Sequence, residues 1–175
     1  FEPMPVLDNS IWVLGCAFVQ AKNIAQNQRF TDQLQDRLQY PVANLGMDGA
    51  APTRVWQTYL ALRQHYTPTY TVFCWPGLDR YHWIDTDKNT LIDLGMWKTD
   101  TQHSIWTAYT IQQLNRQLVN HVKELLKDQA YHFNFKNAMP NQQFIDTDIS
   151  GRQPDRLSHT YIADMLMPIL RPRCT

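Results

Sequence analysis

Short apolar runs alternate along this chain with longer stretches in which apolar residues recur every three or four positions. Runs of the first kind are typical of strands buried on both faces, and stretches of the second kind predict amphipathic helices. The pattern predicts strands at 11–18, 42–47, 70–75, 131–135 and 143–146. It predicts helices at 24–39, 52–66, 104–128 and 154–170, the last of them ended by Pro168 and Pro172.

This alternation of strand and helix is typical of an α/β domain, in which right-handed crossovers produce a parallel sheet. We expect a three-layer α/β/α sandwich, flavodoxin-like, with a parallel sheet of about five strands. A single domain accounts for residues 1–175, with an extended lead-in at 1–10 and an irregular insertion at about 76–100. Ligands of such sheets bind at the carboxyl ends of the strands, so a functional site is expected in the loops that follow the strands.

Composition narrows the classes of function. The 175 residues carry 16 basic and 16 acidic side chains, and a net charge of zero argues against a nucleic-acid partner. No apolar run approaches the ~20 residues that a membrane-spanning helix needs. Three cysteines are too few for a disulfide scaffold, so we expect Cys16 and Cys74 to be buried and Cys174 to be a free thiol. No signal peptide is visible, which favours a virion or an intracellular setting.

The histidines do not indicate a metal site. His82, His103, His121 and His132 lack the mutual spacing that metal ligands show. We therefore expect neither a metal nor a cofactor.

Four segments resemble the sequence blocks of SGNH (GDSL-type) hydrolases. Residues 13–18 (VLGCAF) resemble the Gly-Asp-Ser block, and residues 44–49 (NLGMDG) resemble an Asn-x-Gly-x-x-Gly turn. Residues 73–79 lie where the Gly-x-Asn-Asp block would follow the third strand, and residues 151–163 resemble the block that carries the catalytic histidine. The segments occur in the family's order and span the domain, so the resemblance implies an SGNH-like fold.

The same resemblance places the nucleophile and the base on residues that cannot perform those roles. The nucleophilic serine falls on Ala17, and the aspartate before it falls on Cys16. The general-base histidine falls on Gln153, and its orienting aspartate falls on Ser150. Ester hydrolysis by this route needs a hydroxyl or thiol nucleophile and a base within hydrogen-bond reach. The resemblance thus implies a domain that no longer catalyses ester hydrolysis.

The oxyanion hole is retained only in part. The family's oxyanion-hole glycine matches Gly49, but its asparagine falls on or near Leu78, which offers no donor. Because donors aimed at the developing oxyanion supply much of the catalysis, this loss adds to the previous ones.

One alternative keeps an enzyme. The thiol of Cys16 would replace the serine, and His159 would act as base with Asp155, which lies four residues earlier on the same helix face. With these residues the protein would be an esterase or deacetylase acting on an ester such as an acetylated glycan. A shift of one residue turns a strand side chain to the opposite face, so we favour a buried Cys16 and a structural His159.

The insertion concentrates large amphipathic side chains of the types that dominate protein interfaces. The candidate binding residues are Trp75, Asp79, Arg80, Tyr81, Trp83 and Trp97. Arg80 and Trp83, with the start at Trp75-Pro76, are similar to a virus-associated branch of SGNH-like proteins. We therefore expect a non-catalytic structural or interaction subunit of a larger assembly, such as a virion, with other protein subunits as partners. Two alternatives remain: a glycan-binding module, and aromatic residues that only cover the core.

Overall fold

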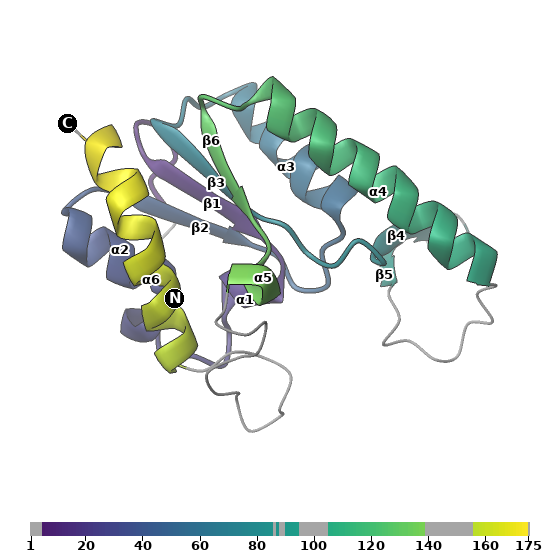
Figure 1. Ribbon diagram of the computed structural model, residues 1–175, viewed down its shortest axis with the longest axis horizontal. Coiled ribbons are helices and arrows are strands. Elements are labelled where there is room, and N and C mark those ends of the chain that lie inside the picture. Colours follow the sequence, from purple (N-terminus) through teal and green to yellow (C-terminus); the bar gives the residue numbers. More distant parts are fainter. Residues whose placement is uncertain (1–4, 86, 88–89, 95–104, 139–155, 175) are drawn as a thin grey trace.

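A parallel sheet forms the centre of the molecule. The computed structural model describes residues 5–85, 87, 90–94, 105–138 and 156–174. Within these residues one sheet has the strand order β2-β1-β3-β6 and lies between two groups of helices (Figure 1). Its strands are β1 (Ile11–Gly15), β2 (Val42–Gly46), β3 (Tyr70–Cys74) and β6 (Ala130–Phe133). β1 pairs with both β2 and β3, and β6 is the last described strand of the sheet beyond β3.

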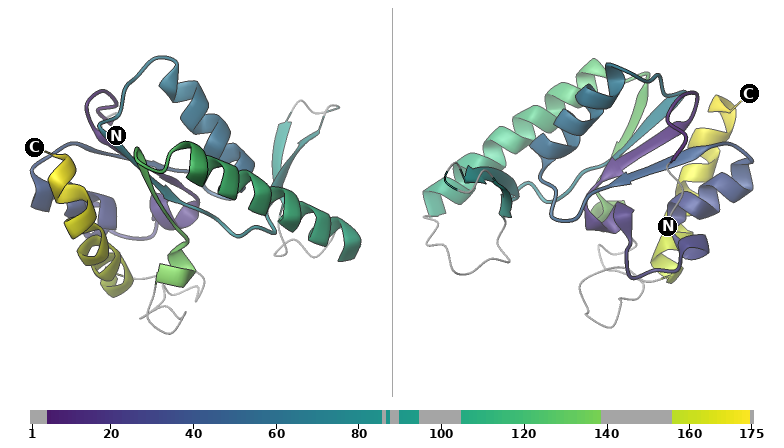
Figure 2. Two further views of the ribbon diagram at one scale, coloured as in Figure 1. Left: turned by 45° about the horizontal axis from the view of Figure 1, so that its top comes forward. Right: turned by 180° about the vertical axis from the view of Figure 1, so that it is seen from behind.

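Helices cover both faces of this sheet, as the two views of Figure 2 show. One face is covered by α3 (Pro52–Arg63) and α4 (Ile105–Leu125). The other is covered by α1 (Ala17–Gln20), α2 (Phe30–Leu38) and α6 (Arg156–Leu170). Three further short elements are η1 (Gln26–Gln28), α5 (Phe135–Ala138) and η3 (Arg171–Arg173). The predicted three-layer α/β sandwich with a parallel sheet is confirmed.

The side chains of β1 divide between two cores. Ile11 and Val13 pack with α2 and α6, and Trp12 and Leu14 pack with α3 and α4. All four are completely buried, because a central strand covered on both sides has no exposed face. Burying a side chain of this size contributes roughly 1.5–3 kcal/mol. The side chains of β1 therefore contact both layers of helices, one layer on each face of the sheet.

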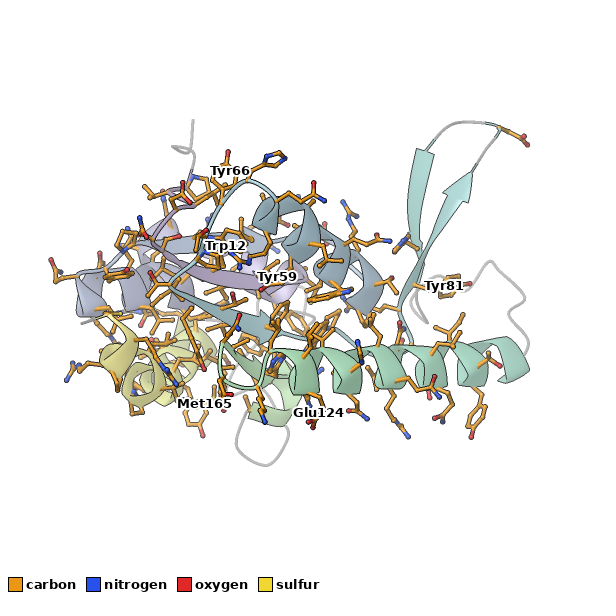
Figure 3. The ribbon with its side chains drawn as sticks, turned by 90° about the horizontal axis from the view of Figure 1, so that it is seen from above. Trp12, Tyr59, Tyr66, Tyr81, Glu124 and Met165 are labelled. Atoms are coloured by element: carbon orange, nitrogen blue, oxygen red, sulfur yellow. The ribbon has the colours of Figure 1, made fainter. Side chains whose placement is uncertain are left out.

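The insertion after β3 is more regular than the sequence pattern suggested. β4 (Tyr81–Asp85) and β5 (Thr90–Leu94) form an antiparallel hairpin, in which Tyr81 pairs with Leu94 and Asp85 with Thr90. Figure 3 shows this hairpin projecting away from the central sheet. The expectation of an irregular segment was wrong for these residues, because two strands rich in aromatic and branched side chains flank a polar turn, a combination that favours a hairpin.

The helix predicted at 24–39 is divided. η1 ends at Gln28, Arg29 is extended with φ −65° and ψ 143°, and α2 starts at Phe30. The first N–H groups of a helix have no acceptor within the helix, and that of Phe30 donates to Nδ1 of His159 at 3.2 Å. A contact with α6 therefore determines where α2 begins.

Two other predictions concern the end of the chain. The strand predicted at 143–146 lies outside the described residues. Pro168 was expected to help end the last helix, but α6 continues through it to Leu170. Pro168 removes the donor for the carbonyl of Asp164 only, and both residues are exposed, so water can bond that carbonyl and the helix tolerates the proline.

Candidate functional site

The carboxyl end of β1 forms the position where the resemblance places a nucleophile. β1 ends at Gly15, Cys16 caps α1 with an extended backbone, and Ala17 is the first residue of α1. A Cβ on Gly15 would lie 2.4 Å from Cγ2 of Val19 and 2.7 Å from the carbonyl oxygen of Cys74. The glycine is therefore required by the close packing of this turn. The half-buried methyl group of Ala17 offers no atom that could attack a substrate.

Asn44 holds the turn after β2 together. Its side-chain Nδ2 donates to the carbonyl of Val19 at 2.8 Å and to Oγ1 of Thr31 at 3.0 Å. Its Oδ1 accepts the N–H of Gly46 at 3.0 Å. With these bonds Asn44 links β2 to α1 and α2, so this residue of the second block has a structural role here.

The glycines of the second block are required by geometry as well. A Cβ on Gly46 would lie 2.1 Å from the backbone nitrogen of Gln20, which leaves no room for a side chain. Gly49 has φ 70°, a left-handed conformation that glycine adopts without strain. It lies in the turn that the Ala50 N–H closes by donating to the Met47 carbonyl at 3.3 Å. Both glycines therefore serve the scaffold whether or not the site is catalytic.

Cys16 and His159 lie in different cores, on opposite faces of the sheet. Cys16 packs with Trp12 and Leu14 on the side of α3 and α4, and His159 contacts Phe30 and Phe135 on the side of α2 and α6. Each is only 1% exposed. The structure therefore does not bring together the thiol and the imidazole of the alternative enzyme. Asp155, the third member of that group, lies outside the described residues, as do Ser150 and Gln153.

His159 is held as a neutral structural residue. Its ring stacks on Phe30 with centroids 5.7 Å apart, and its Nδ1 accepts the backbone N–H of Phe30. Burial, and to a smaller extent the positive charge of Arg29, lower the pKa of His159 from 6.5 to about 4. A general base works best with a pKa near the operating pH. His159 is therefore poorly suited to that role.

The segment after β3 is fastened to α4. Asn115 is almost fully buried, and its Nδ2 donates to the carbonyls of Leu78 and Arg80, both at 2.7 Å. The side chain of Leu78 packs against the core on the side of α3 and α4. At Leu78, where the resemblance places the family's oxyanion-hole asparagine, the chain thus presents an apolar side chain and a carbonyl that is already bonded.

Trp75 lies in the core rather than on an exposed surface. Its side chain is 4% exposed and stacks on Phe73, with ring centroids 5.0 Å apart and planes 7° apart. Its Nε1 donates to Nδ1 of His132 at 3.2 Å. Since the indole N–H can only donate, the neutral ring of His132 carries its proton on Nε2. That Nε2 is buried and has no hydrogen-bond partner in the described part of the chain.

The other candidate binding residues are dispersed. Asp79, Arg80 and Tyr81 are half-buried on the segment that leads into the hairpin, where Figure 3 shows Tyr81 between the hairpin and α4. Trp83 belongs to β4, and Trp97 lies outside the described residues. The structure therefore does not gather this set into one site.

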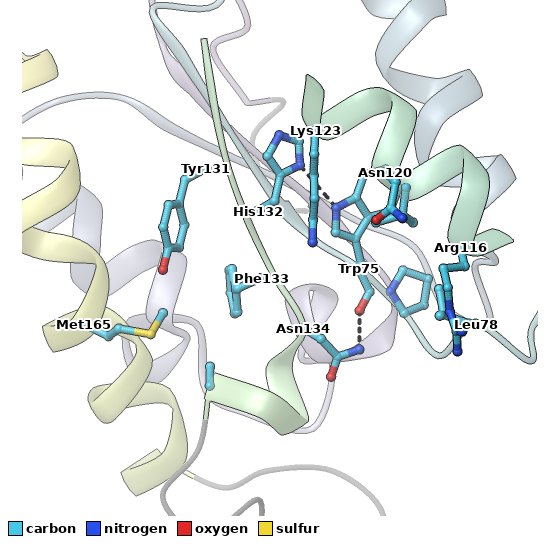
Figure 4. Close-up of a pocket in the computed structure, with 13 residues that line it drawn as sticks. Trp75, Leu78, Arg116, Asn120, Lys123, Tyr131, His132, Phe133, Asn134 and Met165 are labelled. Atoms are coloured by element: carbon cyan, nitrogen blue, oxygen red, sulfur yellow. Dashed lines mark hydrogen bonds between the residues drawn. The ribbon is translucent and has the colours of Figure 1, made fainter. Parts of the chain in front are cut away.

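A cleft that the sequence did not indicate runs along β6. It has a volume of about 730 Å³, and its walls come from α4 on one side and α6 on the other (Figure 4). The lining residues are Trp75, Pro76, Leu78, Arg116, Val119, Asn120, Lys123, Tyr131, His132, Phe133, Asn134, Ala138 and Met165. Of the predicted site residues that the structure describes, Trp75 and Leu78 alone contribute to it.

The wall from α4 is cationic. Arg116, Asn120 and Lys123 are spaced i, i+4 and i+7, which places them on one face of the helix, and all three are exposed. None of the described residues that line the cleft is a carboxylate, and no described carboxylate pairs with Arg116 or Lys123. Burial and the charge of Lys123 lower the pKa of His132 to about 4, so this ring is neutral. The cleft therefore suits an anionic occupant.

Neither a metal site nor a membrane-spanning helix is found in the described residues. No group of three or more His, Cys, Asp or Glu side chains there is placed to hold an ion. None of the described helices is both long and apolar enough to cross a bilayer.

Comparison with solved structures identifies the fold. No protein-family model and no curated protein matches the chain. The crystal structure of TesA matches with a TM-score of 0.59 and 13% identity over 94% of this chain and 99% of that one. The acetyl xylan esterase Est2A from Butyrivibrio proteoclasticus matches with a TM-score of 0.52 and 10% identity, over 99% of this chain and 66% of that one. A lipolytic protein of the G-D-S-L family from Desulfitobacterium hafniense DCB-2 matches with a TM-score of 0.52 and 11% identity, over 91% of this chain and 100% of that one.

The chain therefore has the fold of the SGNH (GDSL-type) hydrolases, as its sequence blocks indicated. At 10–13% identity this likeness concerns the fold alone. Function has to be argued from the residues at the site.

Proposed function

We propose that this chain is a non-catalytic domain of SGNH fold that acts as an interaction subunit of a larger assembly. The observation that carries the proposal is the carboxyl end of β1, where Ala17 stands at the start of α1 and the adjacent Cys16 is buried. Further support is that His159, the histidine of the alternative catalytic group, lies on the opposite face of the sheet from Cys16.

These losses are large on an energetic scale. Removing the nucleophile or the base of a catalytic unit costs about 10⁶ in rate, and further losses in the same unit add little. Moving Cys16 into a position to attack a substrate would require the turn at Gly15, which is closely packed against Val19 and Cys74, to be rebuilt. In support of the proposal, the fold is retained, Ala17 carries no nucleophile, and Cys16 and His159 are both buried.

A protein partner is favoured over a glycan by the position of Trp75. Sugar-binding tryptophans need an exposed ring face, and the ring of Trp75 is covered by Phe73 and His132. Among the described residues, charged and amide side chains from α4 line the cleft beside it. These are features that bind polypeptide.

The proposal is tested by hydrolysis of p-nitrophenyl acetate, compared with the Cys16→Ala and His159→Gln variants. We expect the wild-type rate to equal that of both variants and the rate of an unrelated protein at the same concentration. A wild-type rate at least tenfold above background, abolished in Cys16→Ala, would show that the thiol is a nucleophile and that the proposal is wrong.

A further inference from the structure

A second pocket lies at the amino end of the sheet, opposite the end that carries Ala17 and α1 (Figure 1). Its walls come from the end of α3, the turn into β3, the residues just before β6, and η3. Its volume of about 320 Å³ falls within the roughly 300–1,000 Å³ that small-molecule pockets usually have. The pocket is therefore large enough for a small ligand, at a place where the SGNH resemblance predicts no site.

The base of this pocket is made of buried residues. Tyr59, Tyr70 and Thr71 line it and are only 5%, 7% and 2% exposed. The backbone there is fixed by the sheet, since the N–H of Thr71 donates to the carbonyl of Gln129 at 3.2 Å. The charged side chains around the opening thus stand on a well-packed base.

Two arginines line the pocket, and a neighbouring group holds each of them in place. The guanidinium of Arg173 lies over the ring of Tyr70, with Cζ 4.9 Å from the ring centroid, which is a cation–π contact. Nη1 of Arg63 donates to the carbonyl of Tyr66 at 3.2 Å. No described carboxylate pairs with either arginine. Guanidinium groups with free donors bind phosphate and carboxylate groups strongly, so these two favour an anionic group.

One carboxylate lines the same pocket. Asp128 is exposed, and no ion pair joins it to Arg63, to Arg173 or to any other described cation. A simple anion in the pocket would be attracted by the arginines and repelled by Asp128. A ligand that also carries a cationic donor would turn this repulsion into an attraction.

The balance of charge decides which anionic group fits. The two arginines supply two positive charges, and Asp128 supplies one negative charge. A phosphate monoester carries a charge of about −1.5 to −2 at pH 7, so it matches both arginines, whereas a carboxylate matches only one. We propose that the pocket binds a small molecule with a phosphate monoester and a primary ammonium group. The phosphate lies toward Arg63 and Arg173, and the ammonium lies toward Asp128.

The test is isothermal titration calorimetry with O-phosphoethanolamine, which carries both groups. The titration is made at about pH 8, where the phosphate monoester is a dianion and the ammonium is still charged. Inorganic phosphate lacks the ammonium, and ethanolamine lacks the phosphate. We expect O-phosphoethanolamine to bind at least tenfold more tightly than phosphate, and ethanolamine not to bind. No binding of O-phosphoethanolamine, or an equal affinity for one of the two fragments, would overturn the proposal.

A phosphodiester distinguishes a free small molecule from the headgroup of a lipid. Glycerophosphoethanolamine has the same ammonium group, but its phosphate carries a single negative charge, as in a membrane lipid. We expect it to bind at least fivefold more weakly than O-phosphoethanolamine. Equal or tighter binding would overturn the assignment of a dianionic phosphate and indicate a lipid headgroup instead.

The variant Asp128→Asn tests the ammonium position. Because no described residue bonds to this exposed side chain, we expect the variant to fold like wild type. Its affinity for O-phosphoethanolamine should fall at least tenfold, while its affinity for inorganic phosphate should stay the same or rise, since a repulsive charge is removed. A variant that loses affinity equally for both probes, or for neither, would contradict the proposal.

The variants Arg63→Gln and Arg173→Gln test the phosphate position. Each should weaken the binding of O-phosphoethanolamine and of phosphate at least fivefold. The matched control is Arg171→Gln, which lies two residues from Arg173 in η3 and does not line the pocket, and it should change either affinity less than twofold. Comparable losses in Arg171→Gln and Arg173→Gln would indicate attraction by overall charge only and refute the site. None of these measurements depends on whether the carboxyl end of β1 is catalytic.

Discussion

The tight approach of β2 to α1 makes Gly46→Ala the sharpest test of the packing described above. The added Cβ would lie 2.1 Å from the nitrogen and 2.6 Å from the Cα of Gln20, and 2.7 Å from the carbonyl carbon of Val19. All three are backbone atoms, so no side-chain rotation relieves the contact. α1 would have to move away from β2.

Overpacking of this kind usually costs 1–3 kcal/mol and occasionally more. Because the clash is with backbone, we expect a loss of about 3 kcal/mol in the free energy of unfolding. For a domain of this size each kcal/mol corresponds to roughly 2–4 °C in Tm. The expected decrease in Tm is therefore on the order of 6–12 °C.

Gly77→Ala is the matched control. Its Cβ would lie 2.4 Å from Oδ1 of Asp79, which is the end of a side chain that can rotate away, and the next atom is 3.6 Å distant. Replacing glycine with alanine at a compatible site also stabilises by roughly 0.4–1 kcal/mol through the unfolded state. We expect this variant to stay within about 1 kcal/mol of wild type.

Urea unfolding and thermal melts followed by circular dichroism measure both variants. Two results would refute the reasoning: a Gly46→Ala variant within 0.5 kcal/mol of wild type, or a Gly77→Ala variant as unstable as Gly46→Ala. The first result would mean that α1 does not contact β2 as closely as described, and the second that the loss does not come from a clash with backbone atoms.

Two further predictions concern the buried titratable groups. The pKa of His159 is lowered to about 4 in the folded chain, so between about pH 6.5 and 4 the unfolded chain binds a proton that the folded chain does not. The free energy of unfolding therefore falls as the pH is lowered through that window, by up to about 3 kcal/mol from this residue. Urea midpoints between pH 7 and 4 should show a shallower slope in His159→Gln than in wild type, and equal slopes would contradict a buried neutral His159. Cys16 and Cys74 are each 1% exposed and Cys174 is half-buried, so titration of the native chain with a disulfide reagent should modify Cys174 first and the other two only on unfolding. Rapid modification of two or three thiols in the native chain would show that Cys16 or Cys74 is accessible.

The layered fold could be predicted because it depends on local patterns. The apolar runs at β1, β2 and β3 and the proline at the start of α3 signal their elements within a few residues. The start of α2 could not be predicted in this way, since it depends on a bond between Phe30 and His159, 129 positions apart in the chain. The hairpin was missed although its strands alternate, because the aspartates between them suggested an irregular loop.

The candidate site was predictable in part. Ala17 and Gly49 lie after the strands where the sequence blocks placed them. Trp75 was expected at a binding surface, but it is buried in the core, where it stacks with Phe73 of β3 and His132 of β6. The spacing of Arg116, Asn120 and Lys123 was visible in the sequence, yet such a stripe is typical of a solvated helix face. Its place beside the cleft along β6 became visible only in the three-dimensional fold.

The central claim is that the SGNH fold is present without its nucleophile. The most direct test is to measure the intact mass after incubation with a fluorophosphonate, a reagent that reacts covalently with the active-site serine of serine hydrolases. The account predicts an unmodified mass for wild type, because Ala17 has no hydroxyl and Cys16 is buried. Stoichiometric modification of wild type at a residue near the carboxyl ends of the strands would contradict it, since it would reveal an activated nucleophile there.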